Sequence, residues 1–482
     1  MEERAQNNGG RLNASINKGF VWMISLVAAL GGLLFGYDFV VIGGAKPFYE
    51  SFFHLTTSLQ IGWAMSCALA GCLIGAVLSG GLSDQFGRKR LLILTAILFA
   101  VSSIGTALSG TFALFVAWRI SGGVAIGLAS NLSPMYISEI SPAKMRGRLV
   151  SLNQLTIVIG ILAAQIVNFL IAKPVPANAT SLFILHSWNG QYGWRWMFGA
   201  TAIPSMFFFL GMFLVPESPR WLAKRGDTKR CKDILSRIGG EAHAEQEIRD
   251  IRLSLSNETE RVDFRELLEP KVRGILMVGV ILAIFQQWCG INVIFNYAEE
   301  VFSAAGYKIT GIMFDIVVTG VVNLIFTFVA IRTVDRIGRK ALMTFGAAGL
   351  CVIYLLVGLG YHLGIHGVLM LALVVAAIAC YSCTLAPVTW VILSEIYPNR
   401  IRGAAMSVST FALWLGCFTL TVTFPYLNSL LGPAGAFWIY AVICLLGFVY
   451  LKRKLPETKG KTLEEIEREL VGMASSRLTR ES

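Results

Sequence analysis

Two oppositely charged residues stand inside long apolar stretches of this chain. Asp38 lies near the middle of GGLLFGYDFVVIGG (31–44), in a run that is otherwise uncharged from Phe20, and Arg119 lies within FVAWRISGG. An ionised side chain in such surroundings is costly unless it has a partner or water, so we expect the two residues to pair. Burial favours the neutral carboxyl and a nearby guanidinium favours the carboxylate, so a conformational change can decide whether Asp38 holds a proton. Two alternatives stay open: a purely structural ion pair, and an Asp38 that faces a wet vestibule.

The composition places both charges in a membrane protein. Of the 482 residues, 55% are hydrophobic and only 15% are charged, and the mean hydropathy is +0.64. These values exclude an ordinary soluble protein of this length. The net charge of +12 does not indicate a nucleic-acid partner, because the basic residues form short clusters between apolar runs. The polar start of the chain (1–19) is not followed by a cleavage site after a short apolar core, so we predict no removable signal peptide.

Twelve apolar runs are long enough to cross a bilayer as helices, since about 20 residues span its hydrocarbon core. The predicted spans are 20–44, 59–81, 91–109, 112–133, 149–172, 194–215, 273–297, 311–332, 340–362, 368–394, 403–427 and 433–452. A charged stretch with helix-compatible spacing separates the sixth span from the seventh, and we expect short helices there rather than an enzyme domain. The predicted domains are therefore 1–19, 20–215, 216–270, 273–452 and 453–482.

The short loops predict the orientation of the spans. Loops rich in Lys and Arg alternate with weakly basic loops, and the basic ones are 84–90, 141–148, 335–340 and 398–403. Loops of this kind remain in the cytoplasm. Both termini and the central charged stretch then lie on the cytoplasmic side, so 216–270 is predicted to be a cytoplasmic helical linker.

The two groups of six spans repeat each other. Three motif pairs recur in the same order: DQFGRK (84–89) with DRIGRK (335–340), SEISPAKMRG (138–147) with SEIYPNRIRG (394–403), and PESPRW (216–221) with PETKGK (456–461). Matching motifs in one order, at offsets of about 250 residues, indicate an internal duplication. Parallel repeats of this kind around a midplane cavity are typical of major facilitator transporters.

The motifs also carry a more specific resemblance. They are GGLLFGYD, DQFGRKR, WRISGGVAIGLAS, PESPRW, QQWCGIN, VDRIGRK and LPETKGKTLEE. In this set and order the chain resembles the sugar porter branch of the major facilitator superfamily over essentially its whole membrane region, bacterial xylose/proton symporters more than mammalian glucose facilitators. The resemblance implies an all-α integral membrane protein with twelve transmembrane helices in two six-helix repeats and a cytoplasmic helical linker. It does not identify the sugar.

The resemblance also implies functional residues. Asp38 and Arg119 match the proton-coupling positions of the symporters. A sugar offers hydroxyls that donate and accept and an apolar C–H face, which suits amides and aromatic rings. The positions that match sugar-binding residues are Phe35, Gln154, Gln286, Gln287, Asn292, Asn323, Trp390 and Trp414. A single glutamine among them can instead serve only to join helices.

Several positions depart from the family pattern. Where the family commonly has amides on either side of its span-eleven tryptophan, this chain has Leu413 and Cys417. Asn296 stands where many members have the first of two tyrosines, and Ala386 replaces a glycine beneath Trp390. A sugar reaching this corner would find fewer hydrogen-bond partners. A deoxy sugar, another pentose or a polyol therefore stays open beside xylose and glucose.

Charges at the cytoplasmic helix ends are the predicted gate. They are Asp84, Arg88, Glu139, Arg146, Glu217, Arg220, Asp335, Arg339, Glu395 and Arg402. We expect pairs between the two halves that close the cytoplasmic side when the cavity faces outward and break when it faces inward. The alternative is that they serve only to set topology. No nucleophile–base–acid set, nucleotide-binding loop or metal-ligand spacing is present, so we predict no catalytic residue, no cofactor and no metal site.

These observations favour a secondary active transporter that imports a monosaccharide, a pentose or hexose, with a proton by alternating access. Facilitated diffusion through the same cavity is the alternative. A membrane sugar receptor ranks below both, because only a short tail follows Thr462. The expected partners are the sugar, the proton and the lipid bilayer, with no nucleic acid. We expect a monomer in the plasma membrane, crossing it many times, with both termini in the cytoplasm.

Overall fold

The computed structural model describes residues 16–176, 179–257, 267, 269–306, 309–397 and 401–459. Within these ranges the chain is helical, with turns between the helices and no strand. The first group of helices comprises α1 (Lys18–Phe53), α2 (Ser58–Phe86), α3 (Arg88–Ala107), α4 (Phe112–Ile140), α5 (Ala143–Ile171), α6 (Ser181–His186), the π-helix η1 (Asn189–Gly193), α7 (Trp194–Gly199) and α8 (Ala202–Leu214). Next come α9 (Pro219–Lys224) and α10 (Thr228–Asn257). The last group comprises α11 (Pro270–Trp288), α12 (Ile291–Asn296), α13 (Ala298–Ala304), α14 (Ile309–Ile337), α15 (Arg339–His362), α16 (Val368–Cys383), α17 (Leu385–Glu395) and α18 (Arg402–Lys454).

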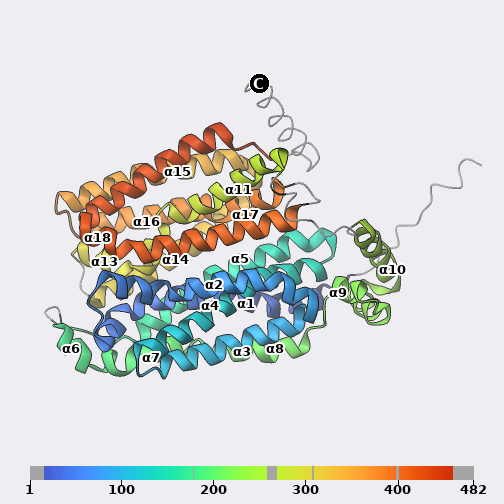
Figure 1. The fold of residues 1–482 in the computed structure, drawn as a ribbon, viewed down its shortest axis with the longest axis horizontal. Helices are drawn as coiled ribbons and strands as arrows, with labels where there is room; N and C mark the ends of the chain where they lie inside the picture. The colour runs from blue at the N-terminus through green and yellow to red at the C-terminus, as the bar shows by residue number, and fades with distance from the viewer. Residues whose placement is uncertain are drawn as a thin grey trace, which may run out of the picture.

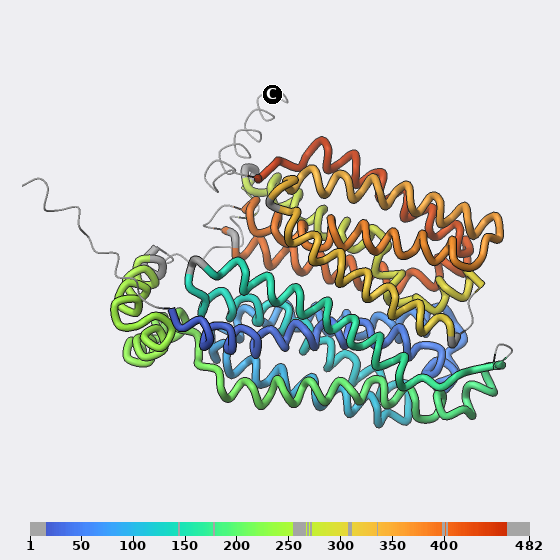
Figure 2. Tube along the Cα trace, turned by 180° about the vertical axis from the view of Figure 1, so that it is seen from behind, coloured from blue at the N-terminus to red at the C-terminus, as the bar shows by residue number. Residues whose placement is uncertain are grey.

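The helices form two bundles that lie side by side. Figure 1 shows α1–α8, the N half, as one layer and α11–α18, the C half, as the other, and Figure 2 shows the same division from behind. The helices α9 and α10 lie at one end of the molecule, which we call the linker end. The opposite end, where α6 and α13 lie, is the far end. Both α9 and α10 fall within the stretch predicted to be a helical linker.

The predicted spans agree with the helices. Eleven helices in the described part of the chain are long and apolar enough to cross a membrane, and the last of them, Gly403–Lys454, contains two predicted spans that meet at Gly432. Counting that helix as two passes gives the expected twelve. Spans seven and ten are each broken in the middle, at Gly290 with φ 90° and at Thr384. The breaks place side chains of α12 and α17 at the centre of the bundle.

Local sequence signals explain where several helices begin and turn. The Asn17 side chain caps α1, and Thr57 and Gln60 form a reciprocal capping box at the start of α2. Gly87 (φ 90°) and Gly338 (φ 104°) make the tight turns from α2 to α3 and from α14 to α15. A side chain would strain both turns, because L-residues rarely adopt this backbone conformation. The two glycines come from the duplicated GRK motifs, so each half turns in the same way.

Small residues let the helices around Asp38 approach closely. A Cβ atom on Gly36 would lie 1.9 Å from the Ile157 carbonyl oxygen, and one on Gly123 would lie 1.8 Å from the Ala68 carbonyl oxygen. Glycine is thus required where α1 crosses α5 and where α2 crosses α4, as at other close helix contacts in membranes. These crossings hold α1 beside α4 and bring the two charged residues of the apolar runs within reach of each other.

The outside of the bundle is apolar. Large hydrophobic side chains that a soluble protein would bury are exposed along both halves, among them Val77, Phe207, Phe213, Phe345 and Val352. Exposed apolar surface of this extent needs a nonpolar surrounding. With the twelve apolar passes, it identifies a multi-pass membrane protein.

Candidate functional site

Asp38 and Arg119 form a buried ion pair inside the N half. The Arg119 Nη1 atom lies 2.8 Å from Asp38 Oδ1 and 2.9 Å from Asp38 Oδ2, and Nη2 donates to the Asp38 backbone carbonyl at 3.3 Å. Asp38 is 4% exposed and Arg119 is 2% exposed. The Arg119 guanidinium also lies 5.2 Å from the centre of the Phe198 ring. The structure thus brings together the two residues that the sequence predicted to pair, and it buries them.

A small cavity of about 10 Å³ links this pair to the C half. Its lining includes Arg119 together with Phe39 and Met65 from the N half, and Asn296 from α12. The Arg119 Nε atom and the Asn296 Oδ1 atom are both buried without a hydrogen-bond partner. A residue with an unsatisfied donor and a residue with an unsatisfied acceptor therefore line the same small space, which is about the size of one water molecule. Asn296 is one of the positions that depart from the family pattern. It is also the residue of the C half that lines this cavity together with Arg119.

The predicted amides of span seven form one hydrogen-bonded chain. Gln287 Nε2 donates to Gln286 Oε1 at 2.6 Å, Gln286 Nε2 donates to the Tyr381 hydroxyl at 2.6 Å, and the Asn292 amide donates to Gln287 Oε1. All three amide residues are less than a tenth exposed. Each amide still has unused capacity to donate or accept, so the chain can exchange internal bonds for sugar hydroxyls. Tyr381, absent from the sequence-based set, anchors this chain.

The other predicted binding residues come from five helices. Asn323 on α14 is buried and accepts a hydrogen bond from Ser382 at 2.6 Å. Phe35 on α1 and Trp414 on α18 approach to 5.6 Å between ring centres, which joins the two halves at mid-bundle. Gln154 on α5 and Trp390 on α17 are half-buried. Of these residues the structure pairs only Phe35 with Trp414 directly, and it ties Asn323 to α16.

The departures at span eleven have visible consequences. Cys417 occupies the position of a family amide, and the Asn292 side chain reaches its sulfur at 3.6 Å, a weak acceptor. The Trp414 indole Nε1 is buried without a partner.

Gln165 on α5 is 1% exposed and neither of its amide atoms has a partner. A glutamine in the middle of an apolar span is the signal that could have added Gln165 to the candidate set.

The predicted gate charges of the N half pair within that half. Arg88 Nη2 lies 3.0 Å from Glu139 Oε1, and Arg88 Nη1 lies 3.3 Å from Asp84 Oδ1. Glu217, in the PESPR motif, accepts hydrogen bonds at 3.0 Å from the backbone N–H groups of Arg88 and Lys89 at the start of α3. A carboxylate at a helix N-terminus satisfies amides that have no partner in the helix.

The C half repeats the main contacts of this arrangement. Arg339 Nη2 lies 3.1 Å from Glu395 Oε1, and Glu457, in the PETKG motif, accepts from the backbone N–H groups of Arg339 at 2.9 Å and Lys340 at 3.1 Å. Thr458 donates to Glu395 Oε2 at 2.6 Å, as Ser218 donates to Glu139 in the N half. The duplication predicted from the motifs therefore extends to the hydrogen bonds.

The expected pairs between the halves are not among the contacts given above, and because they are expected to be broken when the cavity faces inward, that expectation stays a prediction. Each charge pair given above joins helices of one half, because the arginine follows a glycine turn that directs it toward the helix end beside it. The side chains of Asp335 and Arg402, two further predicted gate charges, lie outside the described side chains. The remaining predicted charges, Arg146 and Arg220, line a pocket of about 150 Å³ between α10 and the ends of α4 and α5.

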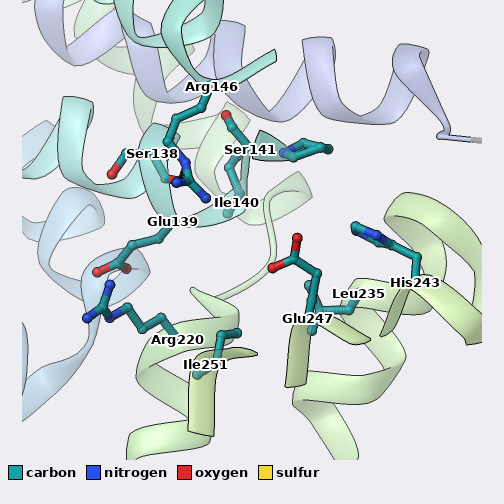
Figure 3. Close-up of a pocket in the computed structure, with 11 residues that line it drawn as sticks. Ser138, Glu139, Ile140, Ser141, Arg146, Arg220, Leu235, His243, Glu247 and Ile251 are labelled. Atoms are coloured by element: carbon teal, nitrogen blue, oxygen red, sulfur yellow. Dashed lines mark hydrogen bonds between the residues drawn. The ribbon is translucent and has the colours of Figure 1, made fainter. Parts of the chain in front are cut away.

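That pocket lies where the linker meets the N half. Figure 3 shows Arg220 beside Glu139, Arg146 beside Ser138, and His243 and Glu247 facing them from α10. Basic and acidic side chains thus meet across the pocket, which suits a contact between α10 and the N half. Within the described residues, no group of His, Cys, Asp and Glu has an arrangement that could hold a metal ion.

Contacts between the halves gather from mid-bundle to the far end. Lys46 on α1 forms ion pairs with Glu299 and Glu300 on α13. Gly43 packs against the Phe295 backbone, where an added Cβ would lie 2.8 Å from the carbonyl oxygen. These contacts close the far end. Sequence reasoning missed Lys46, although a lysine directly after an apolar span and four residues before Glu50 was a usable signal.

A twelve-pass helical bundle with a buried ion pair and a row of buried amides at its centre defines a membrane transporter. The chain belongs to the family described as "Sugar (and other) transporter", whose model matches residues 24–470.

Named relatives cover nearly the whole chain. The arabinose-proton symporter of Bacillus subtilis is 38% identical over 94% of this chain and 96% of its own length. The D-xylose-proton symporter of Escherichia coli K12 is 38% identical over 95% of this chain and 97% of its own length. Among solved structures, the inward open conformation of the xylose transporter XylE from E. coli matches with a TM-score of 0.82 and 36% identity, covering 93% of this chain and 99% of that one. The sugar porter resemblance and the major facilitator fold are thus confirmed.

Proposed function

We propose that this protein is a secondary active transporter that imports a monosaccharide together with a proton by alternating access. The observation that carries the proposal is the buried Asp38–Arg119 pair beside a central row of amides. Two relatives that match almost end to end are named as proton symporters of pentoses, which supports the same substrates here.

In this mechanism Asp38 holds the proton. With both oxygens on Arg119, the carboxylate is stabilised as an anion, and protonation would release the guanidinium. Arg119 then needs another acceptor, and Asn296 Oδ1 borders the same cavity. Proton binding in the N half can thereby alter how α12 of the C half packs.

The sugar binds, on this proposal, between the halves. Gln286, Gln287, Asn292 and Asn323 supply hydrogen bonds, and Gln154 adds an amide from the N half. Trp390 offers a ring face, while Phe35 and Trp414 close the site from the two halves. With Cys417 in place of an amide, the site favours a sugar with one fewer hydroxyl at that corner, such as a deoxy sugar or a pentose.

The orientation follows from the basic loops. We place the linker end in the cytoplasm and the far end outside, with both termini cytoplasmic, in the plasma membrane, and we take the monomer as the working unit. The closed far end then corresponds to an inward-facing state, in keeping with the likeness to an inward open relative. The charge clusters at the linker end serve as gating elements by bracing each half as it moves.

Uptake of a labelled sugar panel tests the proposal. Purified protein in proteoliposomes is given each sugar with and without an imposed proton gradient. We expect accumulation above the equilibrium level only when the outside is more acidic. Equal final levels under both conditions would favour the facilitator, and binding without any uptake would favour the receptor.

A further inference from the structure

Lys46 is a buried cation that holds the two halves together at the far end. Its side chain is 4% exposed, and its Nζ atom lies 2.6 Å from Glu300 Oε1 and 3.4 Å from Glu299 Oε2, both on α13 of the C half. A third carboxylate, Glu50 on α1 itself, lies 3.0 Å away. The ammonium thus has one partner on its own helix and two across the boundary between the halves.

The charges in this cluster do not balance. Three carboxylates surround one ammonium, and the glutamate side chains of Glu50, Glu299 and Glu300 are only 18%, 20% and 22% exposed. Burial, and the charges of Glu299 and Glu50, raise the pKa of Glu300 to about 7, although Lys46 acts in the opposite direction. Carboxylates that share a partly desolvated site cannot all ionise without cost, so one of them takes up a proton readily.

Within the part of the chain that the structure describes, the other titratable groups given for this region do not supply the missing positive charge. The hydroxyl groups of Tyr49 on α1 and of Tyr297, which directly precedes α13, lie close enough to interact electrostatically with Glu50 and Glu300. Asp315 lies on α14, which packs against α13, and would add negative charge. The Tyr361 hydroxyl donates to the Val301 carbonyl of α13, and the His366 side chain lies against Gly306, which follows α13.

We propose that this cluster is a second proton-binding site, a latch that keeps the far end closed while Glu300 is ionised and releases when Glu300 is protonated. A proton from the medium binds to a Glu300 carboxylate oxygen and cancels the charge at the shorter of the two ion pairs that Lys46 forms across the boundary. Lys46 then keeps Glu50 on its own helix and only the longer 3.4 Å pair with Glu299 across the boundary, so release leaves no unpaired buried ammonium. The helices α1 and α13 can separate.

The latch rests on the proposed function only in assuming that the far end opens and closes. It acts apart from Asp38: the inner pair carries the transported proton, whereas the latch sets how often the far end is open. With the far end outside, an acidic medium would raise the outward-facing population, which is the population able to load sugar and proton.

Spin-label distances across the far end test the latch without any substrate. Thr56 in the N half and Leu363 in the C half are exposed near this end, and the backbone N–H of Gly367 ties the Leu363 loop to the Ala305 carbonyl after α13. Labels on Thr56→Cys and Leu363→Cys, in lipid nanodiscs, report the separation of the halves between pH 5 and pH 8.5. In the parent we expect the long-distance population to rise as the pH falls, with a midpoint near 7.

Glu300→Gln keeps the size of the side chain but cannot ionise. We expect it to show a roughly fivefold or larger rise in the open-to-closed ratio at pH 8, and a much weaker pH dependence. Glu50→Gln is the matched control, because it removes a contact within α1 and leaves the link between the halves. It should be at least as closed as the parent at pH 8, and its opening midpoint should move to lower pH, because the Glu50 charge no longer raises the pKa of Glu300.

Lys46→Gln removes the same link from the other side. It should also increase the open population at pH 8, seen as a longer distance between the two spin labels. The proposal is overturned if the parent distances do not depend on pH, or if Glu300→Gln and Lys46→Gln both keep the closed distribution of the parent. Sugar accumulation assayed in parallel separates the two ideas. A latch that responds to pH in a protein without proton-driven uptake would refute the proposed symport alone.

Discussion

The Asp38 carboxylate receives both of its close contacts from one atom of Arg119, Nη1, at 2.8 and 2.9 Å, while the Nε atom of the same guanidinium has no partner. In a side-on bidentate pair, two different nitrogen atoms of the guanidinium would each bond to one carboxylate oxygen. Here a single nitrogen atom makes both contacts, so the guanidinium keeps an unused donor. An arginine with a spare donor can change partners when the carboxylate is neutralised. On the proposed function, this spare donor lets the pair act as a switch.

Asp38→Asn should uncouple transport. The amide keeps the shape of the carboxyl but cannot release a proton, so we expect proton-driven accumulation to be lost while sugar binding and equilibrium exchange persist. Accumulation and exchange are measured in the same proteoliposomes. Asp315→Asn is the matched control, a buried carboxylate on α14 that should accumulate sugar as the parent does. Retained accumulation by Asp38→Asn would return Asp38 to a structural role.

Trp390→Ala should weaken sugar binding about tenfold or more, because it removes an aromatic surface on which the sugar ring can lie. Direct binding by isothermal titration in detergent measures the effect. Trp196→Ala removes an indole that is 63% exposed on α7 and should leave the affinity unchanged. Equal affinities for both variants would place the sugar elsewhere.

Cys417→Asn should widen the range of sugars. An amide beside Asn292 replaces a weak acceptor with a donor and an acceptor. For a sugar with a hydroxyl at that corner, we expect an affinity gain of roughly fivefold, the effect of one added hydrogen bond. Cys444→Ser, on the same helix but bonded to the Cys289 carbonyl, should change no affinity. A uniform change for every sugar tested would argue against a specific contact at position 417.

Arg88→Ala should lower the melting temperature more than Arg339→Ala does. The Arg88 and Glu139 side chains are 9% and 8% exposed, whereas Arg339 and Glu395 are 13% and 23% exposed. Removing the arginine therefore leaves a more deeply buried carboxylate in the N half. Thermal unfolding in detergent at pH 7 compares the two variants. The reverse order would mean that contacts other than these pairs determine the stability of each half.

Glu457 should stabilise the protein in a pH-dependent way. Burial alone would raise its pKa, but hydrogen bonds from the backbone N–H groups of Lys459, Arg339, Lys340 and Thr458 give a net lowering. A lowered folded-state pKa means that the stabilisation is present above the ordinary glutamate pKa of about 4.3 and is lost as the pH falls through the folded value. Glu457→Gln should therefore lower the melting temperature at pH 7 and much less at pH 3.5. An equal deficit at both pH values would contradict this.

Sequence patterns sufficed for the twelve passes, because apolar length is a strong signal and the duplicated motifs confirm the register of the halves. The partner of Asp38 was also predictable, since Arg119 is the matching charge inside an apolar span. Which charges pair within a half was not predictable, because that depends on the direction of the Gly87 and Gly338 turns. At Lys46 the sequence signalled the pair with Glu50 within α1, but not the partners Glu299 and Glu300, because these depend on how α13 packs against α1.

The two halves repeat the same arginine–glutamate pair at the linker end but differ at the centre of the bundle. Asp38 and Arg119 belong to the N half, whereas most of the buried amides belong to the C half. On the proposed function, the two copies of one duplicated unit have diverged, with the proton-coupling pair in the N half and most of the sugar-binding amides in the C half. Substitutions in the C half could then change which sugar is transported while the proton coupling of the N half is kept.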